Sequence, residues 1–259
     1  MFIGITERTG SQASAEQLEI LITRYSWAAS LATHKRVLEV ACGAGVGLEH
    51  ICALAKSLEA WDIEEANVDL ALLNCKNYSA KKLTILKKPA EDLSKVAENS
   101  FDLIIAFECT YYFDDPEAFF AEAYRVLSPN GRLIISSVNP SWHSFNPSPY
   151  SRHYYDAPEF SEVLSKIGFD VTAYRCFTDF PDGVVQNFKK KIKLVAVKYK
   201  LIPKTMKGKA ILKRLFMGRL FTIPSNIFTA NAEIKKLEVF DGNCVSNYHK
   251  MIYFECVKL

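Results

Sequence analysis

Hydrophobic residues recur along residues 15–177 in two alternating patterns: short apolar runs, and longer stretches with an apolar position every three or four residues. The first pattern indicates buried strands and the second amphipathic helices. We expect strands at 36–42, 58–63, 83–86, 101–107, 132–138, 171–177 and 251–258, and helices at 16–32, 47–55, 64–74, 115–127 and 157–167. This alternation predicts a doubly wound α/β fold with a mostly parallel sheet between two helical layers.

Local signals mark several element ends. Asp114 or Asp115 can cap the helix at 115–127, and Pro116 suits its first turn. The sequence Ser-Pro-Asn-Gly at 128–131 predicts a turn, and Gly168 ends the helix at 157–167.

Charge divides the chain into two parts. Residues 183–232 contain twelve Lys or Arg and no Asp or Glu, although the net charge of the whole chain is only +3. The sequence therefore predicts a main domain of residues 1–180 and 246–259, and a basic, mainly helical insertion at 181–245. Within the insertion, apolar residues spaced by three or four predict an amphipathic helix at 188–202 that ends at Pro203, and a second basic apolar stretch runs from 204 to 220.

Three roles are open for this basic block. The first is a lid packed on the core, and the second is a site for the phosphates of a nucleotide-sugar or lipid-diphosphate acceptor. The third is a surface at 183–220 that contacts an anionic membrane. Nucleic-acid binding is disfavoured because the sequence contains no recognisable RNA-binding module.

The seven cysteines predict a reducing compartment. Their number is odd and no CxxC occurs, so we expect free thiols rather than disulfides, and no zinc or other metal site. No apolar run reaches the ~18 residues that span a bilayer, and the first residues do not resemble a signal peptide. The expected location is the cytoplasm, or alternatively the periphery of the inner membrane face.

The segment at 37–47 (VLEVACGAGVG) carries the clearest chemical signal. A strand leads into Gly43 and Gly45, which allow a tight turn and close approach of a ligand, and a helix follows. A dinucleotide fingerprint would place its third glycine at 48, which is leucine. Glu39, inside an apolar strand, needs a partner such as an ammonium group and would repel a pyrophosphate. Asp62, at the end of the second strand, can accept both hydroxyls of a ribose.

This pattern, E-x-x-x-G-x-G followed by an acid that closes the second strand, resembles the class I S-adenosylmethionine (SAM)-dependent methyltransferases. Residues 88–93 (KPAEDL) resemble the family's adenine segment, 99–108 (NSFDLIIAFE) its fourth strand, and 123–135 (AYRVLSPNGRLII) its next helix, turn and strand. The resemblance covers about residues 15–177. It implies a Rossmann-like, seven-stranded sheet with an antiparallel last strand, and SAM as the cofactor.

A subgroup resemblance is narrower. Thr23-Arg24-Tyr25, Phe107-Glu108 and Val138-Asn139-Pro140 are similar to bacterial methyltransferases of glycan and surface-polysaccharide synthesis. One departure is Pro89, which stands where the family often has the adenine-binding Asp, so the adenine amino group would be held by Glu91, Asp92 or a carbonyl.

The resemblance implies a set of site residues. Those expected to bind the cofactor are Arg24, Tyr25, Glu39, Gly43, Gly45, Asp62, Ile63, Ala90, Glu91 and Phe107. Those expected to meet the acceptor are Glu108, Tyr111 and Tyr112, and His143 or His153, after the fifth strand, is the candidate general base.

The predicted function is methyl transfer from SAM to an oxygen, or with less support a nitrogen, of a small polar acceptor such as a sugar or glycan precursor. Two alternatives stay open. One is a lipid or quinone-precursor methyltransferase at a membrane surface, and the other is a protein that binds SAM without catalysis.

Overall fold

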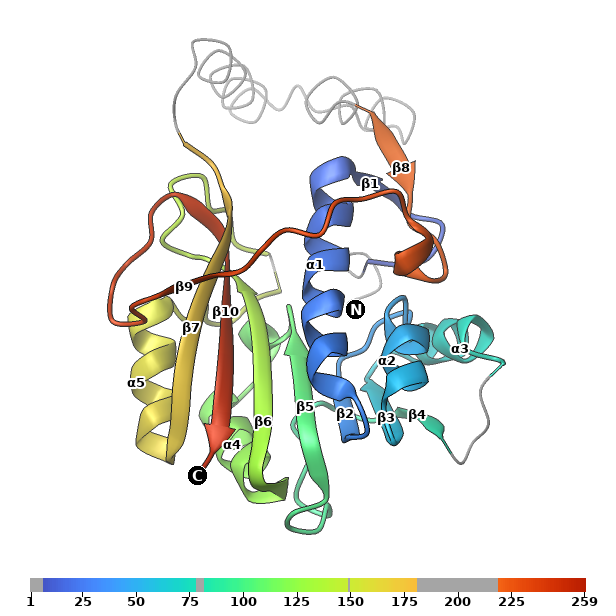
Figure 1. The fold of residues 1–259 in the computed structure, drawn as a ribbon, viewed down its shortest axis with the longest axis horizontal. Coiled ribbons are helices and arrows are strands. Elements are labelled where there is room, and N and C mark those ends of the chain that lie inside the picture. Colours follow the sequence, from blue (N-terminus) through green and yellow to red (C-terminus); the bar gives the residue numbers. More distant parts are fainter. Residues whose placement is uncertain (1–6, 78–81, 149, 181–218) are drawn as a thin grey trace.

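The computed structural model describes residues 7–77, 82–148, 150–180 and 219–259, and its centre is an eight-stranded sheet (Figure 1). The order of the strands is β4-β3-β2-β5-β6-β10-β7-β9. The strands are β2 (Arg36–Val40), β3 (Ser57–Asp62), β4 (Leu83–Lys87), β5 (Phe101–Phe107), β6 (Leu127–Val138), β7 (Phe169–Thr178), β9 (Glu238–Phe240) and β10 (His249–Lys258). Strands β2 to β6 pair in parallel, whereas β10 is antiparallel to both β6 and β7. The predicted Rossmann-like fold with an antiparallel last strand is confirmed.

Helices cover both faces of this sheet. They are α1 (Ala15–Ala32), α2 (Leu48–Leu54), α3 (Glu65–Asn74), α4 (Pro116–Val126) and α5 (Ala157–Ile167). Alternate strand residues point to opposite faces. Val37 and Leu103 therefore pack in one core with residues of α1 and α2, and Leu38 and Ile104 pack in the other with residues of α4 and α5.

The helix ends follow the predicted signals. The Asp115 side chain accepts a hydrogen bond from the N–H of Ala118, and Pro116 begins α4. Asp156 and Glu159 form a capping box at the start of α5, which ends at Gly168 with a φ of 116°.

Two details differ from the sequence prediction. The sheet has eight strands rather than seven, because the three-residue strand β9 pairs with the outer edge of β7. The segment 128–131, predicted as a turn, lies within β6, where Asn130 has a φ of 62° and the pairing with β5 shifts in register between Phe101 and Leu103. A bulge therefore absorbs the turn residues.

The end of the basic region packs on the main domain. Strand β8 (Leu220–Thr222) pairs with β1 (Gln12–Ser14) beside the start of α1, as Figure 1 shows. The 3-10 turn η3 (Ile227–Thr229) follows, and the N–H of Ile227 donates to the carbonyl of Val46 at 2.9 Å. The helix predicted at 188–202, and the basic stretch up to residue 218, lie outside the described residues. The phosphate, membrane and lid roles thus stay predictions.

Among the helices that the structure describes, none is long and apolar enough to cross a membrane.

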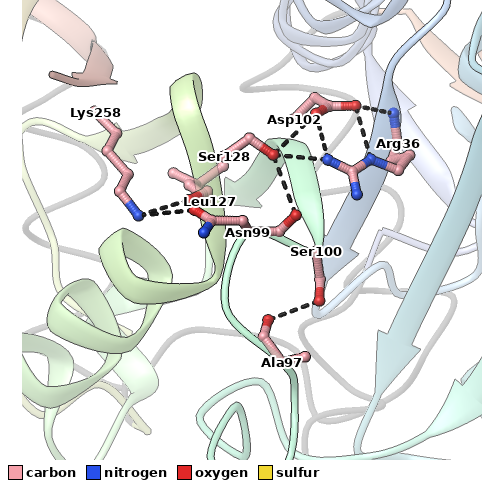
Figure 2. Close-up of polar contacts among 8 residues, drawn as sticks. All are labelled: Arg36, Ala97, Asn99, Ser100, Asp102, Leu127, Ser128 and Lys258. Carbon is pink, nitrogen blue, oxygen red and sulfur yellow. Dashed lines mark hydrogen bonds and ion pairs between the residues drawn. The ribbon is translucent and has the colours of Figure 1, made fainter.

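A polar cluster ties the strands together at the amino ends of β2, β5 and β6, away from the glycine-rich loop (Figure 2). The Arg36 guanidinium and its own N–H donate to the Asp102 carboxylate at 2.7–3.1 Å, and Ser128 donates to Asp102 and accepts from Arg36. Lys258 donates to the carbonyl of Leu127 at 2.7 Å. Hydrogen bonds from Arg36 lower the pKa of Asp102 to about 2.

Candidate active site

A cavity of about 340 Å³ opens at the carboxyl ends of β2, β3 and β5, the edge at which parallel α/β sheets bind ligands. Twelve residues predicted from the sequence line it: Arg24, Tyr25, Glu39, Gly43, Asp62, Ile63, Ala90, Glu91, Phe107, Glu108, Tyr111 and Tyr112. Gly45 shapes the loop without lining the cavity. The predicted cofactor and acceptor residues therefore lie around one space.

The glycine-rich loop adopts a conformation that suits glycine. Gly43 and Gly45 have φ values of 57° and 71°. A Cβ atom at Gly45 would lie only 2.9 Å from the Ala71 Cβ of α3. The loop is thus packed directly on α3.

Asp62 connects the glycine-rich loop to the start of α3. Its Oδ2 accepts from the N–H of Gly43 at 2.9 Å, and its Oδ1 accepts from the N–H of Glu64 and from the Asn67 amide at 2.9 and 3.1 Å. The buried carboxylate therefore holds the loop in place and still borders the cavity. Because a carboxylate offers about four lone-pair sites, Asp62 can also accept from a ligand hydroxyl.

Glu39 is the most deeply buried acid in the cavity, with 2% of its surface exposed. Its Oε1 accepts from the Tyr25 hydroxyl at 2.7 Å, whereas its Oε2 is buried and has no partner among the described residues. Burial raises the pKa of Glu39 to about 7, and the Tyr25 hydrogen bond and the Arg24 charge only partly oppose this. An ammonium group in the cavity would satisfy Oε2 and stabilise the charged carboxylate.

Gly47 allows Tyr25 to reach Glu39. A Cβ atom at this position would lie 2.1 Å from the Tyr25 ring, so any other residue would displace the ring. The last glycine of the motif thus has a packing role that the sequence pattern did not indicate.

Arg24 lies beside Tyr25 on α1 and is 6% exposed. Its Nη2 donates to Oε2 of Glu7 at 2.5 Å, while its Nε and Nη1 are buried and lack partners in the described part of the chain. Burial alone would lower the pKa of Arg24, but the Glu7 carboxylate raises it above its ordinary value. The cavity thus contains a permanent cation with free donors.

Glu108 follows β5 and has a φ of 52°, in the left-handed region that non-glycine residues rarely adopt. Its carboxylate accepts from the Tyr111 hydroxyl at 3.1 Å and from Ser136 Oγ at 3.4 Å. Burial raises the pKa of Glu108 to about 7, and the Arg24 charge opposes this increase. Tyr111 stacks on Tyr154, with ring centroids 4.3 Å apart. A proton acceptor poised near neutral pH therefore borders an aromatic wall.

The segment predicted to hold the adenine borders the cavity. Ala90 and Glu91 line the cavity, as does Pro89. The Glu91 carboxylate accepts from the backbone N–H groups of Asp114 and Asp115, so it fixes the neighbouring loop. Asp92 does not line the cavity, which leaves Ala90 backbone groups and Glu91 as candidate adenine contacts.

The two histidines proposed as general bases lie elsewhere. Neither His143 nor His153 lines the cavity. His143 Nε2 is 3.7 Å from Asp179, and His153 Nε2 is 3.8 Å from Glu159. The structure thus brings Glu108, not an imidazole, to the cofactor and acceptor residues.

Several lining residues were missed by sequence reasoning, among them Glu7, Gln17 and Asn67. Glu7 precedes the first periodic segment, so no pattern pointed to it. Asn67 carried a usable signal, because a polar residue in the first turn of α3 can point back to Asp62.

Residues 38–135 match the family model described as "Methyltransferase domain". A Mycolicibacterium smegmatis protein described as "Probable S-adenosylmethionine-dependent methyltransferase" is 27% identical over 141 residues, which are 52% of this chain and 52% of that protein. The ubiquinone biosynthesis O-methyltransferase of Xanthomonas oryzae pv. oryzae is 31% identical over 104 residues, or 40% and 43% of the two chains. The chain spans about half the length of the curated relatives that it matches.

A SAM-dependent methyltransferase from Archaeoglobus fulgidus has the same fold, with a TM-score of 0.57, 14% identity and coverage of 95% of both chains. Residues 38–135 thus match a methyltransferase domain, and the fold around them is that of solved SAM-dependent methyltransferases. This domain and its fold imply SAM as the cofactor.

The residues that line the cavity fit that cofactor. The unpartnered Glu39 Oε2 suits its ammonium group, the free donors of Arg24 suit its carboxylate, and Asp62 suits its ribose hydroxyls. Ala90 and Ile63 border the space left for the adenine.

Proposed function

We propose that the protein is a SAM-dependent O-methyltransferase that acts on a small acceptor carrying a hydroxyl group. The observation that carries the proposal is the juxtaposition, in one cavity, of the cofactor residues Glu39, Gly43 and Asp62 with the half-buried carboxylate of Glu108. Binding residues alone would suit any SAM-binding protein, whereas a hydroxyl acceptor also benefits from a proton acceptor placed beside them.

When bound, SAM supplies an electrophilic methyl group on its sulfonium. The chain contributes the alignment of the acceptor and the removal of its proton. Glu39, Asp62 and the glycine-rich loop fix the cofactor end of the cavity, while Tyr111 and Tyr112 form a wall for the acceptor.

Glu108 is the residue that receives the hydroxyl proton. A carboxyl group with a pKa near 7 is partly ionised at neutral pH and matches the task of a general base. The Tyr111 and Ser136 hydroxyls orient it, and the positive charge of Arg24 favours its ionised form.

The acceptor class has two candidates. The sequence resemblance to glycan methyltransferases supports a hydroxyl of a sugar or glycan precursor. Several curated relatives are named ubiquinone biosynthesis O-methyltransferases, which supports a hydroxyl on a quinone-precursor ring. The aromatic side chains of Tyr111 and Tyr112, which line the cavity, suit contact with either kind of ring.

The test is a transfer assay with methyl-labelled SAM and two acceptor panels, nucleotide sugars with glycolipids, and hydroxylated benzoate or polyprenyl-phenol compounds. We expect label in the product of one panel, and at least a tenfold lower turnover for Glu108→Gln. Binding of S-adenosylhomocysteine without transfer to either panel would instead support the non-catalytic alternative.

A further inference from the structure

Glu7 lines the cavity, and its carboxylate is paired with Arg24, the residue whose donors suit the carboxylate of the cofactor. Glu7 lines the same space as Glu39 and Glu108, and it makes the ion pair with the buried Arg24. Glu7 itself is about one-third exposed. The carboxylate of Glu7 therefore pairs with the same guanidinium, that of Arg24, to which a ligand carboxylate would bind.

The segment around Glu7 is held across the cofactor loop by its own contacts. Arg8 donates to the carbonyl of Ala66 on α3, and the Asn74 amide bridges the Thr9 hydroxyl to the carbonyl of Ala44 in the glycine-rich loop at 2.9 Å on each side. The N–H of Gly10 donates to the carbonyl of Ile223. These bonds tie residues 8–10 to α3 and to Ile223, and Asn74 links them to the glycine-rich loop. We call residues 7–10 the strap.

Arg24 has hydrogen-bond donors that Glu7 does not use and that a ligand could engage. Glu7 engages Nη2 alone, and the buried Nε and Nη1 have no partners in the described chain. Buried N–H donors without partners cost free energy, which a bidentate carboxylate would recover. Two carboxylates on one guanidinium would, however, leave net negative charge in a cavity that also contains Glu39 and Glu108.

We propose that Glu7 is an internal competitor for the carboxylate site of Arg24. The cofactor's carboxylate displaces Glu7, and the strap of residues 7–10 is released from Arg24 when the cofactor binds. This inference rests on the proposed function. It explains why a buried cation in the cofactor pocket has a partly exposed partner from a segment outside residues 38–135.

The test compares two ligands by isothermal titration calorimetry. S-adenosylhomocysteine carries the amino-acid carboxylate, whereas methylthioadenosine lacks the whole amino-acid group. Glu7→Gln should tighten binding of S-adenosylhomocysteine by roughly three- to fivefold, the upper range for a partly exposed ion pair. Binding of methylthioadenosine should not change.

Glu16→Gln is the matched control, because Glu16 also precedes the cavity in sequence and pairs with Lys250 but does not line the cavity. It should leave both affinities unchanged. Unchanged or weaker binding of S-adenosylhomocysteine by Glu7→Gln would overturn the inference, as would equal tightening of both ligands. If the wild-type protein binds neither ligand, the proposed function fails instead.

Discussion

Replacing Glu39 with Gln should stabilise the ligand-free protein and weaken cofactor binding. The folded-state pKa of Glu39 is about 7, against 4.5 for an unperturbed glutamate. An acid whose pKa is raised by folding loses stability as pH rises from the lower value to the higher, because the unfolded chain ionises first. At about 1.36 kcal/mol per pKa unit, the ionised carboxylate costs the folded protein about 3 kcal/mol at pH 8.

Gln removes this charge but places an amide N–H₂ where Oε2 has no partner, which costs about 1 kcal/mol. The expected net gain is therefore about 2 kcal/mol at pH 8, and it should disappear toward pH 5, where the folded-state carboxyl is already neutral. Affinity for S-adenosylhomocysteine should fall by about 1.5–3 kcal/mol, since an ammonium would lose a charged partner.

Denaturant unfolding at pH 8 and pH 5 measures the stability, and calorimetry measures the affinity. Glu65→Gln is the control, because its side chain is 72% exposed. A Glu39→Gln protein that is less stable than wild type at pH 8, or whose stability difference does not depend on pH, would refute the reasoning.

Three further predictions follow from the same contacts. Asp62→Ala should weaken S-adenosylhomocysteine binding by about 1–3 kcal/mol in calorimetry, with the far-UV circular dichroism spectrum of the fold retained. Glu108→Gln should lower kcat without changing S-adenosylhomocysteine affinity, and should abolish the rise of kcat near pH 7 in a pH-rate profile. Asp102→Asn should lower the free energy of unfolding by about 1 kcal/mol at pH 7. Because the pKa of Asp102 is lowered from 3.8 to about 2, this deficit should shrink in denaturation curves as pH falls through that range.

The main sheet and its helices were predictable because each element carries its own periodicity or end signal. Phe101–Phe107 is apolar except for Asp102, and Ala157–Ile167 is followed directly by Gly168, so both elements were predicted with the observed bounds. Strands β1, β8 and β9 have only three residues each, too few for any pattern, and they form only because their partners are already in place.

The cofactor half of the site was predictable for a similar reason. Glu39 and Asp62 are polar residues in or at the end of apolar strands, where only a specific partner justifies the cost of burial. Glu7 does not interrupt an apolar strand, and only its tertiary contact with Arg24 brings it to the site, so the sequence pattern could not identify it. The two histidines predicted as general bases do not line the cavity, whereas Glu108 does, and burial raises the pKa of its carboxyl group to about 7.

Titration of the wild-type protein with S-adenosylhomocysteine, and separately with NAD, tests the central claim most directly. The acid in β2, the glycine-rich loop and the acid that ends β3 predict saturable binding of S-adenosylhomocysteine at one site per chain. NAD should give no binding heat, because Glu39 opposes a pyrophosphate. Binding of NAD together with no response to S-adenosylhomocysteine would contradict the account.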